Sequence, residues 1–582
     1  MIKYLFFFAL SFSFISCQDK STDTKVTKPE KEREVNIAYL RSDGDSTSTY
    51  TEVIDFYKAL AKNHSSITMT EHYKTDDGQP LHLIEYTPKT ARSNSLNILI
   101  NNGIHPGEPG GIDASMLFFK DLAEGKIKLK ENIKIYSIPI YNIGGAKNRN
   151  SHSRTNQNGP AEYGFRGNAK NYDLNRDFIK SDSKNSKAFY EIYHRVEPDI
   201  FIDTHATNGA DYPYTLTHIF TQQDQLGGAL GQYMNTQFIP EVEDSLTSKK
   251  WEATPYVNVF NRPPDGGFQQ FLDTPRYSTG YSTLWNSIGL VIESHMLKEY
   301  ADRVEGTYAF LKTMAEVSAK NVSEIKEKRD KNFKHFRELA YYPIQYKIDT
   351  TRYRALQFKA FQADTLKSEV TGFDRLKYNR DSSYTVEVEY NNKFKATDSV
   401  KIPKAYIIPQ QWENIVELLK WNSVDYQRLS KDTILDVDYY RISDFETSKT
   451  PYEGHYLHSN TQVKVFNSKQ HFRKGDILVK TDQRAIRYLV ETLEPQAVDS
   501  YFNWNFFDSV LQQKEHFSTY IFEDDAADLL KNDEKLKERF EEKKKGDKNF
   551  AKNWYAQLNW LHKHSKFYED AHLKYPIFKL RE

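Results

Sequence analysis

The chain has 582 residues, in which 80 Lys and Arg are balanced by 80 Asp and Glu. This length exceeds what one hydrophobic core supports and predicts two or more domains. The balanced charge, with no long basic stripe, argues against nucleic acid as a partner. Aromatic residues make up 14% of the chain, which is enough apolar side chain for a large core.

The first 17 residues combine one cation, an apolar run and the only cysteine of the chain, Cys17. The run is shorter than the roughly 20 residues of a membrane-spanning helix, and it predicts an export signal. Its end resembles a bacterial lipobox, which implies a lipid-modified Cys17 anchored to a membrane of the cell envelope, facing the periplasm or the cell surface. The alternative is an ordinary cleaved signal with an incidental cysteine. Residues 18–35 are polar and unpatterned, as expected of a flexible tether.

The most informative stretch begins at residue 97. An apolar, β-branched run breaks at a loop rich in Gly and Pro, and helical apolar spacing resumes from residue 112. This pattern predicts a strand, a tight loop and a helix. His105 and Glu108 lie on this loop, at the carboxyl end of the predicted strand, which is where open α/β sheets usually bind ligands. Both residue types bind zinc. A polar turn with a helix-capping Glu is the alternative for this motif taken alone.

Strands and helices alternate along the first part of the chain. Residues 50–63 have helical spacing, residues 67–87 have the pattern of two strands around a turn, and residues 133–140 form another apolar run. This alternation predicts an α/β fold, with a mixed, mostly parallel central sheet covered by helices on both faces. We expect this domain to span residues 36–335.

Further polar groups follow apolar runs in the same domain. His205 and Glu293 each end a predicted strand, and a Gly-rich loop closes on Asn175 and Arg176. A planar guanidinium beside an amide suits a carboxylate ligand. Two His and one Glu form a catalytic zinc site with an open position, and a further Glu is a suitable base for its water. Each group alone is typical of a structural role, but together they predict one site.

The order of these groups resembles the zinc carboxypeptidases of the carboxypeptidase A type, over roughly residues 45–320. The shared blocks are His105-x-x-Glu108, Asp173-Leu-Asn175-Arg176, His205 after a strand and Glu293 after a strand. The resemblance implies one Zn²⁺ per chain, held by His105, Glu108 and His205, with Glu293 as the general base and acid. It implies hydrolysis of the last peptide bond of a peptide with a free terminal carboxylate.

The same resemblance assigns roles around the metal. Asn175 and Arg176 would bind the terminal carboxylate of the substrate, and Asp173 would orient the ring of His105.

Two assignments retain alternatives. The Arg that polarises the scissile carbonyl is expected to be Arg166, with Arg154 as the runner-up. The mobile Tyr of the family would be Tyr281 or Tyr277, and Tyr281 is taken as the substrate-binding residue.

The remainder of the chain, residues 345–582, is predicted to form an α+β accessory domain. Strand patterns at 384–390 and 462–466 alternate with helical patterns at 411–419 and 483–493. No second catalytic set is found there. Two other functions remain open: a cell-wall peptide or acyl-amide hydrolase on the same fold, and a binding lipoprotein without turnover. The sequence gives no oligomeric state.

Overall fold

The computed structural model describes residues 37–88, 94–129, 132–207 and 209–581. Cys17 and the expected tether lie outside these residues. Within the described ranges, no helix is both long and apolar enough to cross a membrane.

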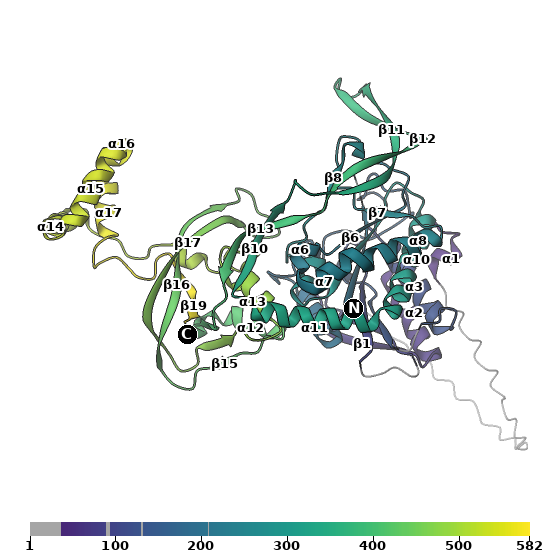
Figure 1. Ribbon diagram of the computed structural model, residues 1–582, viewed down its shortest axis with the longest axis horizontal. Helices are drawn as coiled ribbons and strands as arrows, with labels where there is room; N and C mark the ends of the chain where they lie inside the picture. The colour runs from purple at the N-terminus through teal and green to yellow at the C-terminus, as the bar shows by residue number, and fades with distance from the viewer. Residues whose placement is uncertain (1–36, 89–93, 130–131, 208, 582) are drawn as a thin grey trace, which may run out of the picture.

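An eight-stranded sheet organises the amino-terminal half (Figure 1). Its strands are, in spatial order, β1 (Ile67–Lys74), β2 (Pro80–Tyr86), β4 (Ile133–Ile138), β3 (Leu96–Asn101), β5 (Ile200–Thr207), β9 (Ile288–His295), β6 (Leu216–Phe220) and β7 (Ala253–Pro255). The central strands β4, β3, β5 and β9 run parallel, and β1, β2 and β6 add antiparallel pairings. The predicted mixed, mostly parallel sheet is confirmed.

Helices cover both faces of this sheet. They are α1 (Ala38–Arg41), α2 (Tyr50–Asn63), α3 (Gly110–Ala123), α4 (Ile143–Lys147), α5 (Lys184–Val196), α6 (Gln223–Leu226), α7 (Gly228–Tyr233), α8 (Ile239–Ser248), α9 (Ser278–Leu284), α10 (Tyr300–Lys320) and α11 (Val322–Glu338). Successive strand side chains point to opposite faces. Ile98 and Ile100 of β3 therefore join the core beneath α2, α3 and α10, whereas Leu99 joins the core beneath α5.

The carboxy-terminal half is built mainly from antiparallel strands and adds six helices. The strands are β10 (Tyr341–Ile348), β11 (Arg354–Lys367), β12 (Asp374–Asn391), β13 (Phe394–Lys401), β14 (Ala405–Ile408), β15 (Gln427–Arg428), β16 (Thr433–Thr447), β17 (His458–Phe472), β18 (Ile477–Lys480) and β19 (Lys574–Leu580). The helices are α12 (Glu413–Trp421), α13 (Ile486–Leu493), α14 (Thr519–Asn532), α15 (Glu534–Gly546), α16 (Lys548–Ala551) and α17 (Trp554–His562). Six strands form one sheet in the order β15-β18-β14-β19-β16-β17. The predicted α+β class of this half is confirmed.

Two excursions leave the body of the molecule in Figure 1: the long β11–β12 hairpin and the group α14 to α17. The base of the hairpin is tied to the first half, because β12 pairs with β8 (Phe268–Gln269).

The two halves share a large hydrophobic cluster, and two smaller clusters also contain residues of both halves. Phe189 and Tyr281 of the first half belong to the large cluster together with Leu419, Tyr488 and Trp504 of the second. α11 runs from the first half towards the second and ends at Glu338, three residues beyond the boundary expected at 335 (Figure 1). The second half therefore packs on the sheet face that carries α5.

Candidate metal centre and active site

Three neighbouring parallel strands bring the candidate residues together. β3 leads into the loop that carries His105 and Glu108, while His205 lies on β5 and Glu293 on β9. β5 pairs with both β3 and β9, and His205 is the register partner of Glu293. The carboxyl ends of these strands meet at one edge of the sheet, as expected from the sequence.

The Gly-rich loop after β3 allows α3 to start directly against β5. A Cβ atom at Gly111, in the first turn of α3, would lie 2.0 Å from Oγ1 of Thr204. Only glycine permits this approach of helix and strand. The approach fixes Glu108, just before α3, beside His205, which follows Thr204.

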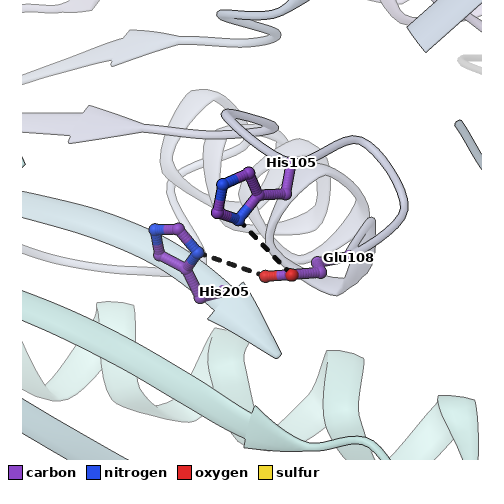
Figure 2. A group of neighbouring side chains, drawn as sticks. All are labelled: His105, Glu108 and His205. Carbon is purple, nitrogen blue, oxygen red and sulfur yellow. Dashed lines mark hydrogen bonds and ion pairs between the residues drawn. The ribbon is translucent and has the colours of Figure 1, made fainter. Parts of the chain in front are cut away.

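His105, Glu108 and His205 converge on one point (Figure 2). Their potential ligand atoms all lie within 4.8 Å of one another, and all three side chains are buried. Nδ1 of His205 lies 3.1 Å from Oε2 of Glu108, and Nδ1 of His105 lies 3.4 Å from Oε1.

Two further carboxylates fix the imidazole rings. Nε2 of His105 lies 2.9 Å from Asp173, the partner that the sequence predicted. Nε2 of His205 lies 3.0 Å from Asp203, which sequence reasoning missed. A carboxylate accepts hydrogen bonds, so both Nε2 atoms donate, and each neutral ring keeps its lone pair on Nδ1. The sequence did contain a signal for Asp203. It precedes His205 by two residues on the predicted strand, and residues two apart on a strand point to the same face.

This arrangement fits a divalent cation. With both Nε2 atoms donating outward, the two Nδ1 atoms and a carboxylate face one another. When the rings are neutral this is repulsive unless a positive charge, either a proton or a metal cation, lies among them. Nδ1 of His105 is buried and has no hydrogen-bond partner among the residues that the structure describes. Two imidazole nitrogens and a carboxylate are the donor set of a catalytic zinc site with an open position. The three predicted ligands are therefore confirmed as a zinc-type site.

The charges of the site act on one another strongly. Burial opposes ionisation of Glu108, but Arg154 and His105 hold the pKa of its carboxyl well below the usual range. Burial also opposes protonation of His205, but Asp203 and Glu108 raise its pKa well above the ordinary value. For Glu293, burial raises the pKa to about 8, assisted by the charge of Glu108. Within the described part of the chain, Oε2 of Glu293 also lacks a hydrogen-bond partner.

A cavity of about 350 Å³ opens over these residues, and both candidate arginines line it. Nη1 of Arg154 lies 2.6 Å from Glu108, and its Nη2 donates to the Ala206 carbonyl. Arg166 is more exposed, pairs with Asp173 at 2.9 Å and lies 3.6 Å from Glu108. The structure thus brings both arginines to the metal site.

Asn175 and Arg176 line the same cavity, together with Tyr277. The Arg176 guanidinium lies 4.5 Å from the centre of the Tyr277 ring. Oδ1 of Asn175 accepts a hydrogen bond from the backbone of Ser278. The predicted carboxylate-binding pair therefore lies beside the metal ligands, facing one tyrosine.

Tyr281, taken from the sequence as the substrate-binding tyrosine, is not at the site. It is fully buried in the core between the two halves, where its hydroxyl donates to Asn422 at 2.7 Å and contacts His194. The physical reason is the start of α9 at Ser278. Tyr277 precedes the helix and faces the cavity, whereas Tyr281 lies one turn in and packs inward.

Comparisons with known proteins place the chain among similar sequences. A profile of the family described as zinc carboxypeptidase matches residues 53–416, more than half of the chain. Carboxypeptidase 2 of Trichophyton equinum is 21% identical over 487 residues, which cover 79% of this chain and 84% of that protein. Carboxypeptidase 2 of Trichophyton rubrum is 20% identical with the same coverage. The crystal structure of carboxypeptidase A from Helicoverpa armigera is 13% identical, covers 47% of this chain and 74% of that chain, and has a TM-score of 0.35.

Proposed function

The chain belongs to the zinc carboxypeptidase family, and from this premise we propose how its residues perform the reaction. It is a peptide hydrolase with a zinc-type site formed by His105, Glu108 and His205. When bound there, zinc supplies a Lewis acid and lowers the pKa of a bound water towards about 7. The observation that carries the proposal is the convergence of these ligands, Glu293 and two arginines in one cavity.

Glu293 is the proposed base and acid. Its Oε2 has no hydrogen-bond partner in the described ranges, and the side chain lies opposite His205 at the cavity wall. It accepts the proton of the attacking water and returns it to the leaving amine. Burial raises the pKa of this carboxyl above its ordinary value, and general acid–base catalysis gains efficiency as the pKa of the catalytic group approaches the working pH.

Asn175 and Arg176 are proposed to bind the terminal carboxylate of a peptide. A guanidinium binds both carboxylate oxygens at once, and the amide adds a further donor. Arg166 is proposed to polarise the scissile carbonyl, because it is the less constrained of the two arginines near Glu108. Arg154 is tied by Gln157 and the Ala206 carbonyl, which suits it to holding Glu108 in place.

The test compares release of terminal residues from linear peptides with that from the same peptides carrying a terminal amide. The wild-type chain should bind one zinc and trim only the free-carboxylate series. Glu293→Gln should keep the zinc and lose at least about a thousandfold in kcat. Glu338→Gln, on the exposed surface at the end of α11, is the matched control and should trim normally.

The other outcomes revise the proposal. Bound zinc without trimming of any linear peptide would redirect the function to cell-wall peptides or acyl amides. A chain that binds no zinc would overturn the catalytic assignment and leave a binding protein.

We also propose that the chain is exported and anchored to a membrane of the cell envelope through Cys17. Support comes from the sequence alone: an apolar run precedes the single cysteine, and a polar stretch follows it. In bacterial cells, the wild-type chain should fractionate with membranes and yield a lipid-modified peptide beginning at Cys17. The Cys17→Ser variant should lose both the membrane fractionation and the lipid-modified peptide. A variant chain that still fractionates with membranes would contradict the anchor.

A further inference from the structure

We propose that a turn of the carboxy-terminal half, residues 452–455, is a positioning element for the substrate's carboxylate site. This inference rests on the proposed role of Asn175 and Arg176. It assigns to the second half a direct part in substrate recognition, through contacts with residues 172–182 of the first half.

The turn connects β16 and β17 and has a specific shape. Tyr452 and His455 exchange backbone hydrogen bonds, while Glu453 and Gly454 have φ of 49° and 86°. Two consecutive residues of positive φ define a tight hairpin turn that normally favours Asn-Gly or Gly-Gly. A glutamate in this conformation is disfavoured, so its side chain needs a compensating contact.

Glu453 has that contact at the metal site's edge. Its Oε2 accepts a hydrogen bond from the backbone N–H of Asp173 at 2.8 Å. The Asp173 side chain in turn accepts from Nε2 of His105. The turn fits closely here, because a Cβ at Gly454 would lie 3.0 Å from the Tyr172 ring. Glu453 therefore fixes the backbone of the residue that orients a metal ligand.

Tyr452 acts on the proposed carboxylate clamp. Its side chain lies close to Arg176 and Arg276 and interacts electrostatically with both guanidinium groups, and the Arg276 guanidinium is 5.6 Å from the centre of the Tyr452 ring. Arg276 is held in place by Asp499 of the second half, at 2.6 Å. Since Tyr277 follows Arg276 and lies against Arg176, the second half supports both sides of the clamp.

His455 fastens the other end of the turn. Its Nε2 lies 2.8 Å from Asp182, which also accepts from the buried Lys180 at 2.7 Å. None of the turn residues lines the cavity. They are therefore positioning residues, which act on substrate through Asp173 and Arg176.

The experiment uses the full chain and peptide pairs with a free or an amidated terminus. Tyr452→Phe removes only the hydroxyl, so we expect KM for the free-carboxylate peptide to rise about tenfold while kcat stays within about twofold. The control is Tyr456→Phe on the same loop, where the tyrosine is 53% exposed, and it should leave KM unchanged.

A second set of variants tests Glu453. Glu453→Ala should lower kcat/KM about tenfold, and Glu453→Gln, which keeps an acceptor oxygen, should recover most of that loss. Glu446→Ala, at an exposed position of β16, controls for charge removal. Melting temperatures are measured in parallel, because a merely structural role would lower stability without a selective change in KM.

The outcomes separate this inference from the proposed function. If the wild-type chain trims free-carboxylate peptides but KM is unchanged in Tyr452→Phe and kcat/KM is unchanged in Glu453→Ala, the turn has no positioning role. If the wild-type chain trims no peptide, the proposed function itself has failed, and the inference fails with it. A selective rise in KM with rescue by Glu453→Gln supports the inference.

Discussion

Asp203→Asn tests whether the carboxylate behind His205 tunes the metal site. Oδ2 of Asp203 accepts from Nε2 of His205 at 3.0 Å and from Ser278 at 2.5 Å, and Oδ1 accepts from Asn101 at 3.1 Å. An asparagine has one acceptor oxygen and no charge. If its oxygen stays on His205, the ring keeps its tautomer but loses a negative partner. If its NH₂ group faces His205, the ring proton is forced onto Nδ1, the atom needed for the metal.

The expected loss in zinc affinity is about 10- to 100-fold, or roughly 1.4 to 2.7 kcal/mol, as for other carboxylates that orient metal-binding histidines. The smaller value corresponds to loss of charge alone. In that case the NH₂ group of the new asparagine faces Asn101, whose Oδ1 has no partner among the described residues, and the Asn101 amide can flip to accept from that NH₂ group. The assay is competition for zinc against a chelator of known affinity, followed by kcat at saturating zinc.

Asp113→Asn is the matched control, because Asp113 is equally buried in the same half but contacts Ser48 and Tyr300 instead of the site. It should leave zinc affinity unchanged. A folded Asp203→Asn chain that binds zinc as tightly as wild type would refute the reasoning.

Three further predictions concern binding, packing and pH. Arg176→Lys should raise KM about tenfold for free-carboxylate peptides without changing zinc content, because an ammonium cannot bind both oxygens in a planar pair; an unchanged KM in steady-state kinetics would contradict the clamp. Tyr281→Phe should cost about 1 kcal/mol in urea unfolding, since it removes one hydrogen bond of the buried Asn422, with KM unaltered; an altered KM at full stability would return Tyr281 to the site. Burial raises the pKa of Glu491 from 4.5 to about 8, so the folded chain retains a proton that the unfolded chain loses, and stability falls as pH rises across that window. Glu491→Gln should reduce the dependence of the free energy of unfolding on pH, measured between about pH 5 and 8.5. An unchanged pH dependence in the variant would contradict the raised pKa of Glu491.

The zinc ligands could be predicted from the sequence because local signals locate them. A β-branched run followed by a Gly-rich loop places His105 and Glu108 at a strand end, and adjacent parallel strands deliver His205 and Glu293 to the same edge. Asp203 could have been predicted too, because side chains two residues apart on a strand point to the same face. The apolar run ending in His205 predicted only the metal ligand.

The choice between Tyr277 and Tyr281 needed the structure. The two tyrosines are four positions apart in the sequence, about one helical turn, so spacing alone does not reveal that α9 begins between them. No sequence signal linked Glu453 to Asp173 either, because 280 residues separate them along the chain. Contacts of this kind follow from how the two halves pack, which the local pattern does not encode.

The metal itself is the most direct test of the account. Zinc X-ray absorption on the purified full chain, with anomalous diffraction at the zinc edge, measures both the stoichiometry and the ligands. We predict one zinc per chain, bonded to Nδ1 of His105, Nδ1 of His205 and the carboxylate of Glu108 at about 2.0 to 2.2 Å. A chain without zinc, or a zinc bound elsewhere while these three side chains stay unligated, would contradict the account.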